Sequence, residues 1–412
     1  MQKSEIYRFH YGYIIVLCGC LIMGLNVGLT MSCAGIFYQS VSNELNVSVG
    51  KLGIYMSFNF LASTLILPIA GKLIEKYSLR WLLTLSSTIS GLTLLGMGFF
   101  NSLWQFYVAG CVQGGTLAFL MYLSYPILIN RWFNIRVGFF VGLCSAASGI
   151  GGVLFSPASA WLITNCGWRM AYIVFGMVIL LVGTPLLGLL LRDRPSDKGL
   201  SPYGHTEKRE IIQKTDGIAY EQAAKMPIFY GMILFAFLML SVSTLNWFFP
   251  DYVSTLGYTL EQSSFVASAV MVGVTVGKVL LGMINDKNCI AGVLITTLCG
   301  IIGLGFLLMH IGLPVLIFGG FLFGWAYAGV TVQTIMLVHQ AFGNKDYTKI
   351  YSIVSVAFAI GGAISAGGWG LLADATSYGF IFIMGIIFLV LSGSIGLFAL
   401  YIRRKNMRRQ AA

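Results

Sequence analysis

The sequence predicts an all-α membrane protein with twelve transmembrane helices arranged as two pseudo-symmetric six-helix bundles. Its composition excludes a soluble globular chain, because 57% of the 412 residues are hydrophobic, only 9% are charged and 50 are glycine. Twelve apolar runs follow one another, each close to the roughly 20 residues that a helix needs to cross a bilayer. A short pattern after the second run recurs after the eighth, which indicates two related halves.

A polar segment in the middle of the chain divides the apolar runs into two sets of six. We therefore expect a first bundle in residues 1–191, a cytoplasmic linker in 192–226, a second bundle in 227–402 and a basic cytoplasmic tail in 403–412. The runs of the first bundle are 13–37, 52–70, 81–100, 104–129, 137–163 and 170–191, and those of the second are 227–249, 262–284, 290–311, 314–338, 350–372 and 378–402.

The basic residues give the expected orientation. With the N-terminus inside, all but three of the 25 lysines and arginines fall on the cytoplasmic side, the exceptions being Lys51, Arg169 and Lys278. Because cytoplasmic loops carry an excess of Lys and Arg, we expect a multi-pass protein of the plasma (cytoplasmic, inner) membrane with both termini in the cytoplasm. The net charge of +11 then reflects membrane topology, and no nucleic acid partner is expected. The first run is too long for a cleavable signal peptide.

The recurring pattern is Gly-x-x-x-acid-basic. Its first copy contains Gly71 and Glu75, followed by Arg80. Its second copy contains Gly282 and Asp286, about half the chain later. We expect each copy to form a tight turn in which glycine lets helices approach and the carboxylate accepts from basic groups and helix-end amides. Duplicated six-helix halves are typical of alternating-access transporters, whereas a common membrane turn would explain only one copy.

Lys278 is a charged residue within the apolar segment VGVTVGKVLLGMINDK, residues 272–287. An ammonium near the bilayer centre costs about 2.5–3.5 kcal/mol on insertion scales, so such a residue usually faces a cavity and has a function. A lysine is a point charge with three donors, which suits it to hold one carboxylate. The alternative is snorkelling, in which the long stem carries the charge to the nearer interface.

Several motifs resemble the oxalate/formate antiporter and monocarboxylate transporter branch of the major facilitator superfamily, over essentially the whole chain. They are Asn130-Arg131-Trp132-Phe133 with Arg136-Val-Gly138, Gly167-Trp168-Arg169, RDRPSDKGLSPYG after the sixth run, and the cationic Lys278. The resemblance implies the twelve-helix fold and a role for Arg131 and Arg136 in the conformational motif. It also implies that Tyr122 and Tyr327 lie at the substrate site, where a phenol donates to a carboxylate while its ring faces an apolar cavity.

Two departures from that branch narrow the expected substrate. Eukaryotic monocarboxylate transporters resemble one another in having a basic residue in the first helix, and the run 13–37 contains no charge. Oxalate exchangers of the branch have a second cation in the eleventh helix, and the run 350–372 contains none. A single lysine favours a monoanion. The predicted substrate-binding residues are Lys278, Tyr122, Tyr327, Asn59 and Asn246, the two asparagines lying deep in helices that line the cavity in the superfamily.

These features predict a secondary transporter of a small organic monocarboxylate, similar to lactate, formate or pyruvate, that works as a monomer in the lipid bilayer. No Asp or Glu lies within any of the twelve runs. Transport is then expected to exchange the substrate for a counter-anion, or to use a proton shared between the substrate and Lys278, since burial disfavours a charged lysine.

Other functional classes are excluded or kept as alternatives. No phosphate-binding loop is present, which excludes an ATP-driven pump. No catalytic constellation, metal site or cofactor motif is present, so we expect neither an enzyme nor a bound cofactor. The alternatives are an exporter of amphipathic or drug-like organic acids on the same fold and a non-transporting membrane sensor.

Overall fold

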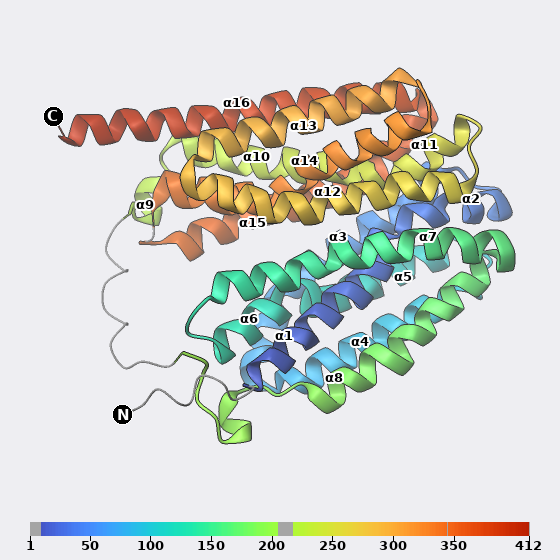
Figure 1. Cartoon of the computed structure of the whole chain (residues 1–412), viewed down its shortest axis with the longest axis horizontal. Coiled ribbons are helices and arrows are strands. Elements are labelled where there is room, and N and C mark those ends of the chain that lie inside the picture. Colours follow the sequence, from blue (N-terminus) through green and yellow to red (C-terminus); the bar gives the residue numbers. More distant parts are fainter. Residues whose placement is uncertain (1–9, 205–216, 344, 412) are drawn as a thin grey trace.

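The structure, a computed structural model, describes residues 10–204, 217–343 and 345–411. Figure 1 shows two layers of long helices, one containing α1 to α8 and the other α10 to α16. We call the end of the molecule at which α8 stops and α10 begins the linker end, and the opposite end, at the α2–α3 turn, the far end. Residues 205–216 of the predicted linker, and residues 1–9 with Lys3 and Arg8, lie outside the described residues.

The first layer contains three continuous or nearly continuous helices and three crossings that include π-helical turns. In chain order these are α1 (Gly12–Leu21) with the π-helix η1 (Ile22–Ser32) and α2 (Ala34–Leu45), α3 (Val49–Lys76), α4 (Leu79–Met97), α5 (Leu103–Leu117) with the π-helix η2 (Ala118–Leu123) and α6 (Ser124–Trp132), and α7 (Val137–Val178) with the π-helix η3 (Ile179–Gly183) and α8 (Thr184–Leu190). The chain reverses within α7 at Gly167, whose φ of 82° is readily adopted only by glycine.

The second layer follows two short helices, η4 (Pro195–Lys198) and α9 (Tyr220–Ala223). Its members are α10 (Pro227–Ser243) with the 3-10 helix η5 (Thr244–Phe248) and α11 (Phe249–Thr255), α12 (Leu260–Lys287), α13 (Cys289–Met309), α14 (Leu313–Phe342), α15 (Tyr347–Ala375) and α16 (Tyr378–Ala411). Side-chain caps begin several of these helices. Thr259 and Gln262 cap α12 reciprocally, and Asn288 Oδ1 accepts from the first amides of α13.

Within the described residues, ten helical segments are long and apolar enough to cross a membrane. One of them, Val137–Leu190, has 54 residues and contains the reversal at Gly167, so it supplies two crossings. The 19-residue α4 supplies the remaining crossing. The predicted all-α membrane fold with twelve transmembrane helices is therefore confirmed.

The seventh crossing differs from its prediction in an important way. It continues to Thr255, beyond the predicted end at residue 249, and so includes Asp251. The Asp251 side chain is buried, with 5% of its surface exposed. The expectation that no carboxylate lies within a crossing is therefore wrong. It failed because η5 and Pro250 interrupt the apolar run without ending the helical path.

The two layers contact one another mainly through α3 against α15 and α7 against α12. At the far end, a Cβ added to Gly370 would lie 2.5 Å from the Cα of Gly50, a distance that real Cβ atoms do not adopt. Nearby, the rings of Tyr38 and Phe248, one from each layer, pack with centroids 5.7 Å apart. The far end of the interface is therefore closed by direct backbone and aromatic contact.

Candidate functional site

Lys278 of α12 extends across the interface to the first layer. Its Nζ donates to Ser145 Oγ at 3.1 Å and to the Ser145 backbone oxygen at 3.4 Å, and Ser145 belongs to α7. Among the described residues, the one ion pair is formed by Glu44 and Arg169. No described carboxylate therefore lies within ion-pair distance of Lys278. Lys278 lies nine residues before the end of α12, roughly 13 Å along the helix axis. The ammonium is thus held between the layers by neutral oxygens and does not snorkel to the linker end.

Two tyrosines of the fourth crossing lie beside this contact. The Tyr125 hydroxyl is hydrogen-bonded to the Ser145 side chain, which links it to Lys278. Tyr122 lies on the π-helix η2, and its neighbours include Tyr125 and, in the other layer, Tyr327 of α14. Its side chain is 36% exposed, and its neighbour Tyr327 belongs to the other layer. Tyr122 therefore borders the space between the two layers.

The chain of contacts continues into the second layer. The Tyr327 side chain is next to that of Asn246, which lies on η5 and is buried. Asn246 Nδ2 has no partner among the described residues. Four predicted substrate-binding residues, Lys278, Tyr122, Tyr327 and Asn246, thus lie in one group of neighbouring side chains, in which Ser145 and Tyr125 are the neighbours of Lys278. Tyr122 and Asn246 both lie on turns that depart from α-helical geometry, a feature that often marks functional positions.

Asn59, the fifth predicted residue, lies elsewhere. It is buried in α3, where it lines a cavity of about 10 Å³ together with Thr30, Gln113 and Tyr172, all within the first layer. Its Oδ1 has no partner among the described residues. This cavity has about the volume that one water molecule needs. Asn59 is therefore not one of the residues gathered around Lys278.

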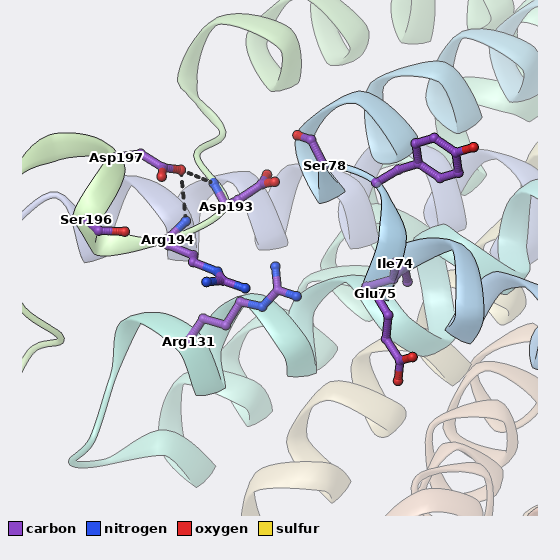
Figure 2. Close-up of a pocket in the computed structure, with 9 residues that line it drawn as sticks. Ile74, Glu75, Ser78, Arg131, Asp193, Arg194, Ser196 and Asp197 are labelled. Atoms are coloured by element: carbon purple, nitrogen blue, oxygen red, sulfur yellow. Dashed lines mark hydrogen bonds between the residues drawn. The ribbon is translucent and has the colours of Figure 1, made fainter.

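Two residues of the predicted conformational motif, Glu75 and Arg131, line a pocket of about 560 Å³ at the linker end, shown in Figure 2. Its lining residues are Ile74, Glu75, Tyr77, Ser78, Arg131, Asp193, Arg194, Ser196 and Asp197. The Asp193 carboxylate accepts from the backbone amides of Leu79 and Arg80 at 2.9 and 2.7 Å and thereby caps α4. The helix-end role expected of Glu75 is thus performed by Asp193, which the sequence reasoning missed.

The basic residues of this motif have separate positions. Arg80 Nε donates to the backbone oxygen of Gly188 at 2.7 Å, so it joins α4 to α8. Arg131 is half-buried and lines the pocket. Arg136 is exposed at the start of α7 with a φ of 53°. Figure 2 shows the Arg131 and Arg194 side chains extending toward the same part of the pocket.

The prediction of tight turns at Gly71 and Gly282 is wrong. Both glycines lie inside helices, α3 and α12, and an added Cβ at either position would meet no heavy atom within 4 Å. Helices do not approach closely at these positions in this conformation. Asp286 is exposed, and its neighbour Asn285 makes the local contact by donating to Gln333 Oε1 at 2.9 Å.

A family profile matches nearly all of the chain, and two relatives match different shares of it. The profile of the Major Facilitator Superfamily matches residues 20–311 and 233–412. Probable transporter MCH2 of Saccharomyces cerevisiae is 27% identical over 283 residues, which cover 67% of this chain and 57% of that protein. Human Monocarboxylate transporter 12 is 22% identical over 422 residues, which cover 96% of this chain and 81% of that protein.

Among solved structures, a bacterial homolog of the human lysosomal transporter Spinster, in an inward-facing and occupied conformation, is similar with a TM-score of 0.75. The likeness covers 94% of this chain and 97% of that one at 14% sequence identity, so it concerns the fold alone. With the family profile matching both halves, the chain belongs to the Major Facilitator Superfamily, a family of transporters rather than enzymes.

Proposed function

We propose that this protein transports a small organic monoanion, a monocarboxylate of the lactate, formate or pyruvate kind, by alternating access between its two halves. Substrate exchange for a counter-anion and proton-linked transport both fit this proposal. The likeness to a protein named Monocarboxylate transporter 12 supports the same substrate class. The transporter would lie in the plasma membrane with its linker end in the cytoplasm, because the basic residues of the chain gather there.

The observation that carries this proposal is the position of Lys278. Its ammonium lies between the two layers, where among the described residues it donates to Ser145 oxygens, and Tyr125 and Tyr122 are close to this contact. A carboxylate is a stronger partner for an ammonium than a hydroxyl or a carbonyl oxygen, because a hydrogen bond between two charged groups is shorter and stronger. An arriving monocarboxylate would therefore displace Ser145 from Lys278 and accept from Tyr122 and Tyr327.

This displacement would connect substrate binding to movement of the halves. The contact between Lys278 and Ser145 joins α12 to α7, two helices that pack against one another across the interface. A substrate that takes the ammonium away from Ser145 releases a polar contact between residues 1–191 and residues 227–402, the two proposed bundles. The proposed linker, 192–226, would keep the bundles joined during this movement.

The direct test is uptake of labelled lactate, formate and pyruvate by proteoliposomes that contain the Lys278→Gln variant. Loss of a hydrogen bond to a charged group costs about 1.5–3 kcal/mol, so substrate affinity is expected to fall about 10- to 100-fold. Lys287→Gln is the matched control, since Lys287 is exposed at the end of the same helix. That control is expected to retain the affinity of the original protein.

A thermal-shift screen distinguishes the substrate class. Monocarboxylates are expected to raise the melting temperature of the original protein, by mass action on the folded state, and to raise it far less in Lys278→Gln. Dicarboxylates are expected to have little effect because one cation serves one negative charge. Normal uptake by Lys278→Gln would contradict the site assignment, and stabilisation only by amphipathic acids such as bile salts would instead favour the exporter alternative.

A further inference from the structure

A second polar cluster lies at the far end, away from Lys278. Asp374, near the end of α15, is exposed, and its Oδ2 accepts from the backbone amide of Gly50 at 3.1 Å. Gly50 is the second residue of α3, so this carboxylate from one layer caps a helix of the other. The N-terminus of a helix carries a partial positive charge, which stabilises an ionised carboxylate. The Asp374–Gly50 contact is therefore a polar latch across the interface.

Asp251 lies beside this latch but in a different environment. It is 5% exposed, its carboxylate accepts from the Tyr378 hydroxyl, and Asp374 is its charged neighbour. A buried carboxyl beside another carboxylate does not ionise readily, because burial and a neighbouring like charge both disfavour its charged form. The helix terminus and the solvent stabilise the charge on Asp374. The proton of the pair therefore belongs on Asp251.

The other titratable groups near the pair come from several elements. The Tyr252 ring of α11 contacts the Tyr378 ring, with centroids 5.6 Å apart, and also the His310 ring at 5.9 Å. Lys51 follows Gly50 in the sequence and is exposed. Among the described residues, neither His310 nor Lys51 has an ion pair with Asp251 or Asp374. His310 is the histidine in contact with this cluster, so it is the alternative group to test.

We propose that Asp251 binds a proton when the far end is closed, and that the Asp374–Gly50 latch makes closure depend on that proton. Opening the far end separates α15 from α3, removes the helix terminus from Asp374 and admits water to Asp251, which then ionises. The closed state binds one more proton than the open state, so acid favours closure and alkali favours opening. For one linked proton, the ratio of closed to open molecules changes at most about tenfold per pH unit. This inference is independent of the substrate.

The test measures the far-end distance directly. Nitroxide labels are attached at Asn43→Cys in α2 and Thr255→Cys in α11, both exposed at the far end, with the exposed Cys111 and Cys166 replaced by serine. Distances are recorded by pulsed electron spin resonance in lipid nanodiscs, without substrate, from about pH 5 to about pH 8, a range that covers the ordinary and raised titration of a carboxyl group. The population with a long distance is expected to grow as the pH rises.

Three variants identify the group responsible. Asp251→Asn mimics the protonated carboxyl and is expected to remain closed at every pH. Asp374→Asn weakens the latch and is expected to be more open throughout. His310→Asn is the matched control, because asparagine tolerates the left-handed backbone of position 310, where φ is 55°, and it should keep the full pH response.

Each result bears on the inference. A pH response that persists in Asp251→Asn, or disappears in His310→Asn, would overturn it, and so would a distance distribution of the original protein that is independent of pH. The original protein alone gives this last result, so the inference can fail even where a variant does not fold. Lys278→Gln is expected to keep the pH response. Failure of the substrate proposal and failure of this inference are therefore distinguishable.

Discussion

The two ends of the interface between the layers differ in how closely the helices approach. At the far end, cross-layer hydrogen bonds run from Gly367 N to Ser57 Oγ and from Trp247 Nε1 to the Met31 backbone oxygen, each 2.9 Å long. At the linker end, Gly71 and Gly282 have open space where a side chain would be. Gly370 at the far end thus contacts the opposite layer, whereas Gly71 and Gly282 at the linker end are free. In an alternating-access transporter, each conformation has one end closed and the other open, and the two ends of this structure differ in that way.

The largest effect is expected from a side chain placed in the far-end contact. Gly370→Ala would put a Cβ 2.5 Å from Gly50 Cα and 2.7 Å from the Phe248 ring, whereas Gly368→Ala, on the same helix, meets no atom within 4 Å. Overpacking of this kind typically costs 1–3 kcal/mol, on the order of a 5- to 150-fold shift of the equilibrium toward the open far end. The pulsed electron spin resonance distances described above measure this shift.

Gly368→Ala makes this comparison specific. Both substitutions add one methyl group to α15 and both raise intrinsic helix propensity by about 1 kcal/mol. If Gly368→Ala opens the far end as much as Gly370→Ala does, the contact with Gly50 does not determine closure. Equal melting temperatures with different distance distributions would assign the effect to the interface rather than to folding.

A smaller effect is expected from removing one cross-layer hydrogen bond. Ser57→Ala deletes the acceptor for the Gly367 amide, and an ordinary hydrogen bond contributes about 0.5–1.5 kcal/mol. The open population should therefore rise roughly 2- to 10-fold. Ser352→Ala is the control, because Ser352 is exposed in α15 near the linker end and its hydroxyl donates to the Lys349 backbone oxygen of the same helix. A far-end distance that is unchanged in Ser57→Ala would mean that glycine packing alone closes this end.

The sequence was sufficient for the fold because each crossing is long and apolar, and bilayer thickness fixes the length that such a helix needs. It also singled out Lys278, since a charge within an apolar run is energetically unusual. The resemblance to a transporter branch added Tyr122 and Tyr327. These predictions required no knowledge of how the two layers are placed relative to one another.

The residues that were missed depend on that placement. Ser145 is one of several small residues in an apolar run, and only the packing of α7 on α12 makes it the partner of Lys278. Asp251 follows a proline at the end of an apolar run, which is typical of a solvated helix end, yet the chain around it is buried. Asn59 was predicted by depth alone, and depth does not distinguish the interface from the interior of one layer. The rotation of each helix and its tertiary contacts determine which of these side chains face the interface. A short stretch of sequence shows neither.

The smallest effect on the structure described here is expected from the linker-end glycines. Substitutions there test whether the two ends close by the same kind of contact. Gly71→Ala and Gly282→Ala meet no atom within 4 Å, so the far-end distances should not change and the melting temperature should stay equal or rise slightly, since alanine favours a helix over glycine by about 1 kcal/mol. If the linker end closes during transport as the far end closes here, both positions will then contact the opposite layer. Uptake by proteoliposomes should therefore fall in these variants while substrate affinity, measured by thermal shift, stays the same. Uptake at the original rate would mean that these glycines are free in both conformations and that the two ends close by different contacts.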